Sequence, residues 1–243
     1  MILPIGDINP CRSVPVVNYL LLGANVVVFL LFGLAPGDAY GQIVLDWGFR
    51  PAALQAGESN AVLTLFTSMF LHGDVWHLAG NMLFLWICGD NVEDTLGSIG
   101  YLVFYVACGL AAGLAHMALT KDPNVPCIGA SGAISGVLGA YVVFFPHGRI
   151  KLLYFINMWW NGVWIVPAIG AIGFWFAEQA LLTFLALGAE GSTGVAYGAH
   201  VGGFVLGAAA AGLLRGVGLA RPAAVEHMER YYERPYRRQE RYW

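Results

Sequence analysis

Charged side chains are scarce in this sequence, and their scarcity argues against a soluble protein. Asp, Glu, Lys and Arg make up 11% of the residues, whereas about a quarter is usual in soluble domains. The net charge of −3 and the lack of a basic stripe leave no nucleic-acid-binding signature, so no nucleic-acid partner is expected. The four cysteines include no C-x-x-C pair, and no metal site is expected from them.

No cleavable signal peptide is expected either. The first apolar stretch is long, and it has neither a basic leading region nor a clear small-x-small cleavage site. We interpret it as a retained helix. Apolar residues, at 58%, and glycine, at 32 residues, are abundant instead. In an apolar chain, abundant glycine indicates helices that pack closely through small residues.

Six apolar stretches approach the roughly 20 residues that a membrane-spanning helix needs. They are too long for barrel strands and do not alternate polar with apolar residues. The prediction is an all-α membrane protein, a bundle of six transmembrane helices in residues 16–217, after a segment 1–15 and before a polar tail 218–243. The expected spans are Val16–Leu34, Trp76–Val92, Tyr101–Leu119, Ile128–Phe145, Val163–Leu187 and Val195–Leu214.

The connections between the spans contain further apolar pieces. The first connection, Ala35–Val75, is long, and its pieces Ile43–Phe49 and Leu63–Leu71 are too short to span, so we expect them at the membrane interface. The connection Pro146–Gly162 is rich in aromatic residues, which prefer the headgroup level.

Lysine and arginine predict the orientation, because cytoplasmic loops carry an excess of them. Six spans place both termini on one side, and that side is predicted to be cytoplasmic. An organelle transit peptide is lacking, which favours a bacterial inner membrane. The basic residues on the predicted cytoplasmic side are Arg12, Arg149, Lys151, Arg215, Arg221, Arg230, Arg234, Arg237, Arg238 and Arg241, against Arg50 and Lys121 on the other side.

A few polar side chains fall inside the predicted spans. Placing a polar group inside a membrane costs free energy, so these residues are candidates for a function. His77 and Asn81 lie in the first turns of the second span, and Ser131 in the first turns of the fourth. His200 lies about two turns into the sixth span. These three spans run in the same direction, so the four side chains share a shallow level near the external face.

This set of side chains suits acyl transfer. Serine needs a base within hydrogen-bond reach, which suggests Ser131 as nucleophile and His200 as base. His77 and Asn81 are four residues apart on one helical face. With the Ser131 amide, both can donate hydrogen bonds to an oxyanion. No Asp or Glu lies near this level, so the prediction is a Ser–His dyad. Gly203 and the small residues beside it allow the close helix approach that the dyad requires.

The remaining polar residues have simpler interpretations. His72 is interpreted as a loop or water-access residue, and His116 as a packing or snorkelling residue. Asp90 and Glu93 lie toward the opposite end of the second span and are interpreted as structural or water-exposed. Glu178 is mid-span, without an intramembrane Lys or Arg to pair with, and its role is open.

Three motifs together resemble the rhomboid family of intramembrane serine proteases. They are His77-Leu-Ala-Gly-Asn81, Gly129-Ala-Ser131-Gly132 and Ala199-His200-Val-Gly-Gly203, in the family's order and on its second, fourth and sixth helices. The resemblance extends over residues 60–210. It implies Ser131 as nucleophile, His200 as general base, and His77, Asn81 and the Ser131 amide as the oxyanion site. It also implies no cofactor, a gate near the fifth helix, and single-pass transmembrane proteins as substrates, cleaved near the external face.

The sequence departs from the family pattern at two places. Ala61-Val-Leu-Thr64 stands where many members carry a Trp-Arg pair in the first connection. Ser135 stands where some members place an aromatic ring against the catalytic histidine, so another group must hold the imidazole here.

Two other functions compete with proteolysis. A catalytically inactive rhomboid-like protein that binds transmembrane helices predicts the loss of Ser131 or His200, and both are present. A channel or transporter predicts polar groups through the midplane or paired broken helices, whereas the polar groups here gather near one face.

Overall fold

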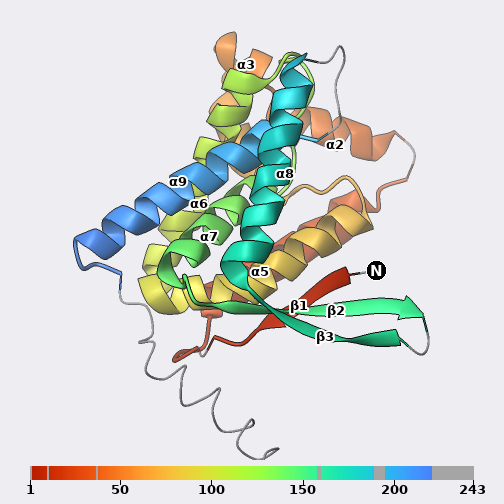
Figure 1. The fold of residues 1–243 in the computed structure, drawn as a ribbon. Coiled ribbons are helices and arrows are strands. Elements are labelled where there is room, and N and C mark those ends of the chain that lie inside the picture. Colours follow the sequence, from red (N-terminus) through yellow and green to blue (C-terminus); the bar gives the residue numbers. More distant parts are fainter. Residues whose placement is uncertain (1, 10, 37, 158–159, 189–194, 221–243) are drawn as a thin grey trace, which may run out of the picture.

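The computed structural model describes residues 2–9, 11–36, 38–157, 160–188 and 195–220, most of them in helices (Figure 1). Two short elements are not α-helical: η1 (Phe29–Gly33) is a π-helical turn, and η2 (Ser68–Phe70) is a 3-10 turn. In chain order the elements are β1 (Ile2–Asp7), α1 (Val16–Val28), η1 (Phe29–Gly33), α2 (Ala39–Trp47), α3 (Pro51–Gln55), α4 (Ala61–Thr67), η2 (Ser68–Phe70), α5 (Val75–Leu96), α6 (Ser98–Leu119), α7 (Ser131–Phe144), β2 (Arg149–Asn157), β3 (Trp160–Pro167), α8 (Ala168–Gly188) and α9 (Tyr197–Gly216).

Four helices within the described residues are long and apolar enough to cross a membrane: Val16–Gly33, Ser98–Leu119, Ala168–Leu187 and Tyr197–Gly216. Four of the six predicted spans are therefore confirmed by length and composition. α5 is long enough but carries acidic residues toward its C-terminal end. α7 has 14 residues, or about 21 Å, less than the roughly 30 Å of a hydrocarbon core. The count of six stays a prediction.

The short helix α7 occupies the centre of the bundle, with α5, α6 and α9 packed around it (Figure 1). Nearly all of its side chains are buried, from Gly132 to Tyr141 without interruption. Helices covered on every side need no polar outer face, which explains why α7 reads as a continuous apolar and small-residue run. Its first residue, Ser131, is half-buried at the start of this run.

The contact between α7 and α9 is made through glycine. A Cβ atom added to Gly203 would lie 2.1 Å from the carbonyl oxygen of Gly132, and one added to Gly207 would lie 2.1 Å from that of Gly136. No side chain fits such a gap, so the two backbones touch directly. This confirms the predicted close packing of the small-residue stripe on the sixth predicted helix.

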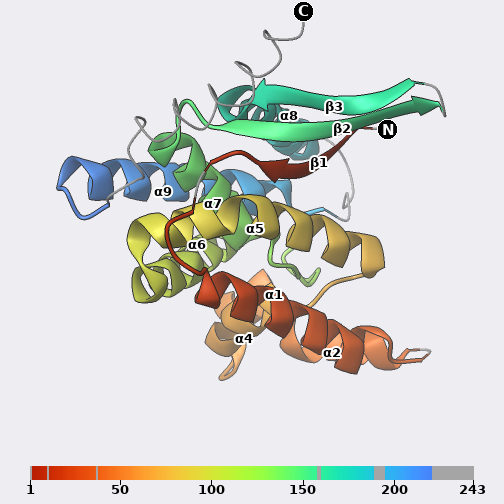
Figure 2. The ribbon, with the colours of Figure 1, turned by 90° about the horizontal axis from the view of Figure 1, so that it is seen from below.

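A three-stranded antiparallel sheet corrects the all-α prediction. The strand order is β1-β2-β3, and the sheet lies along one side of the bundle (Figure 2). The predicted loop Pro146–Gly162 forms β2 and the beginning of β3, and the predicted fifth span starts only at Ala168. The residues Val163–Pro167 are β-branched, aromatic and apolar, and a short apolar run of this kind suits a strand as well as a helix.

The far end of α5 anchors the first helix. The Glu93 carboxylate accepts hydrogen bonds from the backbone amides of Val17, at 3.0 Å, and Asn18, at 2.7 Å, and from the hydroxyl of Ser98, at 2.6 Å. The first amides of a helix have no intrahelical acceptor, so Glu93 satisfies the start of α1. This supports the structural interpretation of Glu93.

Strand β1 and the C-terminal end of α9 lie at the same end of the bundle. The Tyr141 hydroxyl donates to Asp7 of β1 at 2.6 Å, and Arg215 of α9 donates to the carbonyl of Val143 at 2.6 Å. Both contacts are at the end of α7, away from Ser131. The cytoplasmic assignment of this end stays a prediction, and most of the predicted tail, residues 221–243, lies outside the described residues.

The glycine contact predicts a strong difference between two substitutions on α9. Gly207→Ala pushes a methyl group into the backbone of α7 and should destabilise the fold by roughly 1–3 kcal/mol. Gly212→Ala is the matched control, because a Cβ there meets no atom within 4 Å. It should be neutral or stabilising by up to about 1 kcal/mol. Thermal unfolding in detergent measures both, and equal unfolding midpoints would contradict the contact.

Asp7 predicts a pH-dependent stability. Burial raises the pKa of this carboxyl from 3.8 to about 7, against the lowering effect of the Tyr141 hydrogen bond. Between these two values the folded protein binds the proton more tightly than the unfolded chain, so this contribution to stability falls as pH rises from about 4 to 7. Asp7→Asn keeps an acceptor for Tyr141 and should flatten the change in unfolding temperature between pH 4 and 8. Asp46→Asn, exposed on α2, should keep the wild-type slope.

Candidate active site

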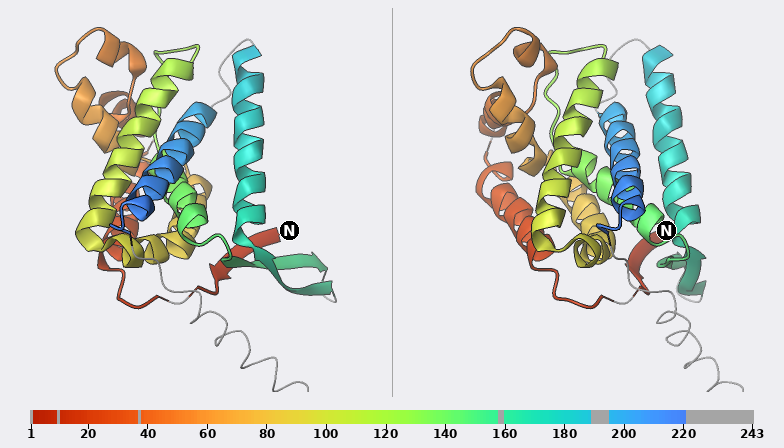
Figure 3. Two further views of the ribbon diagram at one scale, coloured as in Figure 1. Left: turned by 60° about the vertical axis from the view of Figure 1, so that its left-hand side comes forward. Right: turned by 90° about the vertical axis from the view of Figure 1, so that its left-hand side faces the viewer.

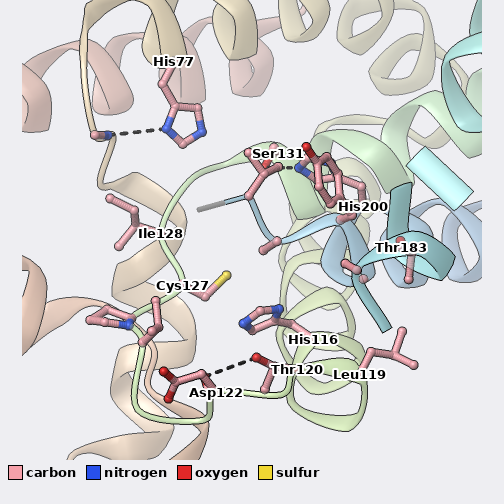
Figure 4. Close-up of a pocket in the computed structure, with 18 of the residues that line it drawn as sticks. His77, His116, Leu119, Thr120, Asp122, Cys127, Ile128, Ser131, Thr183 and His200 are labelled. Carbon is pink, nitrogen blue, oxygen red and sulfur yellow. Dashed lines mark hydrogen bonds between the residues drawn. The ribbon is translucent and has the colours of Figure 1, made fainter. Parts of the chain in front are cut away.

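Two side chains far apart in the sequence meet where α7 and α9 begin. Ser131 is the first residue of α7, and His200 lies in the first turn of α9. The Nε2 atom of His200 is 2.8 Å from the Oγ atom of Ser131 (Figure 4). This is hydrogen-bonding distance, and an imidazole in this position can take the hydroxyl proton and leave a nucleophilic oxygen.

The pair opens onto a cavity of about 580 Å³, which also contains His77 and Asn81 in its lining. All four predicted site residues therefore line one cavity. Its rim includes the exposed residues Asp74, Lys121 and Asp122. Exposed charged groups at the rim keep water close to a site that is otherwise surrounded by apolar helices.

The position of His77 is set by the start of α5. The Asp74 carboxylate caps the helix by accepting from the amides of Trp76, at 2.8 Å, and His77, at 2.9 Å. The amide of Gly73 donates to Nδ1 of His77 at 3.4 Å. A neutral ring with Nδ1 as acceptor carries its proton on Nε2, and a Cβ on Gly129 would lie 2.9 Å from this atom. The Nε2 edge of His77 thus faces the Gly129 backbone, next to Ser131.

Gly129 has a backbone that only glycine adopts without strain. Its φ angle is +120°, in the region that side chains avoid. A side chain here would also meet the His77 ring. Glycine at this position lets the chain turn into α7 directly beneath the imidazole.

Asn81 lies one turn further along α5 and is 7% exposed. Its Nδ2 atom is buried and has no hydrogen-bond partner among the described residues. A buried donor without an acceptor costs free energy. Because the side chain lines the cavity, an oxygen atom of a bound molecule is the acceptor that this donor fits.

Several known proteins are similar to this chain. A profile of the Rhomboid domain matches residues 59–216. The chain belongs to the rhomboid family. It is 32% identical over 196 residues to the mitochondrial Rhomboid protein 1 of Saccharomyces cerevisiae, a match covering 78% of this chain and 50% of that protein. It is 30% identical over 163 residues to the Rhomboid protease GluP of Bacillus subtilis, covering 67% of this chain and 30% of that protein.

The human mitochondrial Presenilin-associated rhomboid-like protein is 28% identical over 136 residues, which is 55% of this chain and 34% of that protein. The chain thus spans half or less of the length of these three rhomboid relatives. Two of the three are mitochondrial, so the expectation of a bacterial inner membrane finds no support in them.

One polar contact of this rhomboid site was not predicted. The Oε1 atom of Gln179 lies 2.7 Å from Nδ1 of His200, on the side of the ring opposite Ser131. The rings of Trp175 and Tyr197 also pack near the imidazole, with centroid distances of 5.9 and 6.4 Å. These three groups hold the imidazole in place of the aromatic ring that some family members carry at the position of Ser135. The one clue in the sequence is a strongly polar amide in the middle of an apolar helix.

The other polar candidates lie around the site without joining the pair. The Ser135 hydroxyl donates to the carbonyl of Ser131 at 2.6 Å, within α7. His116 lines the cavity, and Glu178 is exposed on α8. His72 is buried beside His77, and burial lowers the pKa of His72 to about 4, so its ring is neutral. His72 lies in the loop before α5, which fits the first of its two predicted roles, and its deep burial does not favour the second, water access.

Proposed function

We propose that this rhomboid protein is an intramembrane serine endopeptidase. It cleaves the transmembrane segments of single-pass membrane proteins near the cavity end of the bundle by a Ser131–His200 dyad, with the chain embedded in the lipid bilayer as a multi-pass protein. The observation that carries the proposal is the 2.8 Å distance between Oγ of Ser131 and Nε2 of His200. The Bacillus subtilis relative, which is named a protease, supports the same reaction class.

The dyad accounts for both halves of the hydrolysis. Oγ of Ser131 attacks the peptide carbonyl carbon while its proton passes to Nε2 of His200. The imidazolium then gives this proton to the leaving amine as the C–N bond breaks. A water molecule then gives a proton to the same nitrogen and attacks the ester carbon. As the bond from this carbon to Oγ breaks, the imidazolium returns the proton to Oγ, which releases the new carboxyl group and restores Ser131 and neutral His200.

Three donors in the cavity lining would stabilise the oxygen that becomes negative during each attack. They are Nδ2 of Asn81, Nε2 of His77 and the backbone amide of Ser131. Since Ser131 begins α7, its amide is among those without an intrahelical acceptor. Donors that are already in place stabilise the oxyanion without reorganising in the transition state.

The substrate must unwind before it reaches the dyad. Amides of a transmembrane helix are bonded within the helix and shielded by side chains. Ser131 lines a cavity between helices, where an extended stretch of substrate fits more easily than an intact helix. Glycine or proline near the scissile bond weakens the substrate helix, so such segments unwind at the lowest cost in free energy.

Removing either member of the dyad should abolish proteolysis. The test is cleavage of a single-span reporter with a Gly-Pro-containing segment, after reconstitution of the full chain in liposomes. Ser131→Ala should reduce the rate to background, and His200→Ala should reduce kcat by roughly 10³-fold or more. Ser135→Ala is the control, because its hydroxyl bonds only within its own helix.

The outcomes separate the proposal from its alternative. A Ser131→Ala protein that cleaves at the wild-type rate contradicts the dyad. A wild-type protein that binds the reporter in co-purification but never cleaves it is the result expected of a catalytically inactive, helix-binding relative.

The unpaired amide of Asn81 predicts a specific kinetic defect. Asn81→Leu keeps the branched shape and the number of side-chain heavy atoms but removes the donor, so kcat should fall by about 10²–10³-fold with little change in KM. Asn91→Leu replaces another buried asparagine, near the opposite end of the same helix, and should leave kcat unchanged. A kcat of the Asn81→Leu enzyme within twofold of wild type would show that Asn81 does not stabilise the oxyanion.

A further inference from the structure

The buried amide of Gln179 completes a chain of hydrogen-bonding groups across three helices. Gln179 is 6% exposed on α8, and its Oε1 atom lies 2.7 Å from Nδ1 of His200 on α9. The opposite ring nitrogen, Nε2, lies 2.8 Å from Oγ of Ser131 on α7. α8 stands at the edge of the bundle beside α9 (Figure 3), and Gln179 connects it to the reacting groups.

The identity of the facing atom decides which tautomer the histidine adopts. A neutral imidazole has one N–H group and one acceptor nitrogen, and the partner of one nitrogen determines the role of the other. An amide oxygen only accepts hydrogen bonds, so the ring must place its proton on Nδ1. Nε2 is then left with a free lone pair for the proton of Ser131. The reverse tautomer would direct an N–H group at Ser131 and could not act as its base.

A neutral amide suits this position better than a carboxylate. Gln179 is buried among apolar helices, where an ionised carboxylate carries a large desolvation cost and an amide a much smaller one. The amide orients the ring but adds no charge to it. Trp175 and Tyr197 restrict the ring from other directions, and at position 135 on α7 there is only a serine.

We propose that Gln179 is a positioning residue, which holds His200 in the tautomer that can accept the Ser131 proton. The inference rests on the proposed proteolysis. It makes the reactivity of the Ser131–His200 pair depend on a third helix, α8. The acceptor oxygen is what matters, so a side chain of similar length with an oxygen at the same place replaces the glutamine, and an apolar one does not.

Three variants of the full chain test the kinetic consequence in liposomes. Gln179→Met keeps the length and replaces the amide oxygen by a thioether, a much weaker acceptor, and kcat should fall roughly ten- to a hundredfold with KM nearly unchanged. Gln179→Glu, which burial keeps protonated and neutral, still offers a carbonyl oxygen at the same place and should retain kcat within about threefold of wild type. Leu181→Met, exposed on the same helix, should match the wild type. A Met variant with wild-type kcat, or a Glu variant as slow as the Met variant, overturns the inference.

The second measurement reads the tautomer directly and does not depend on cleavage. Solid-state ¹⁵N NMR of histidine-labelled protein distinguishes protonated from unprotonated ring nitrogens, and His200→Ala assigns the signal. The wild type should show His200 protonated on Nδ1, and Gln179→Met should show a mixture of tautomers. A wild-type signal with the proton on Nε2 overturns the inference.

The two measurements keep the inference separate from the proposed function. If the wild type cleaves nothing but shows the expected tautomer and its loss in Gln179→Met, proteolysis fails and the positioning contact stands. If the wild type cleaves and the tautomer is the same in both proteins, the role of Gln179 fails and proteolysis stands.

Discussion

The direct backbone contact between α7 and α9 is the constraint on which the site depends. Glycines on both helices bring the carbonyl groups of Gly132 and Gly136 within 2.1 Å of where a Cβ of the facing glycines would stand. At this separation the first turns of the two helices hold Ser131 and His200 at hydrogen-bonding distance. A wider contact would still give a stable apolar bundle, but the hydroxyl and the imidazole would no longer meet.

The elements around α7 and α9 supply polar partners and a cavity for this polar pair, which otherwise lies among apolar helices. α5 lines the cavity with His77 and Asn81 at one end and, at the other, uses Glu93 to satisfy the start of α1. α8 supplies the amide of Gln179 for the far side of the imidazole. The His200 ring therefore has a polar partner at each nitrogen, whereas Nδ2 of Asn81 and both ring nitrogens of His72 are buried without a partner among the described residues.

Features that follow from a local sequence pattern, such as the motif residues, could be predicted from the sequence. Contacts that depend on how two helices face each other could not. Ser131, His200, His77 and Asn81 stand in motifs, and the structure places all four on one cavity. The strand Trp160–Pro167 was predicted as part of a loop and a span, because a short apolar run does not distinguish strand from helix. Two adjacent residues on α8 are polar. Glu178 is a functional candidate in the sequence because it is charged, but the structure exposes it. Gln179 is buried against His200, and only the rotation of α8 about its axis reveals this.

The most direct test of the reactive pair is the site of covalent labelling by a fluorophosphonate, which reacts with activated serine hydroxyls and needs no knowledge of the natural substrate. Peptide mapping by mass spectrometry after treatment of the full chain in detergent should find the phosphonyl group on Ser131 and on no other serine. The label should be lost when His200 is replaced by alanine. Labelling of a different serine, or equal labelling of Ser131 without His200, would contradict the account.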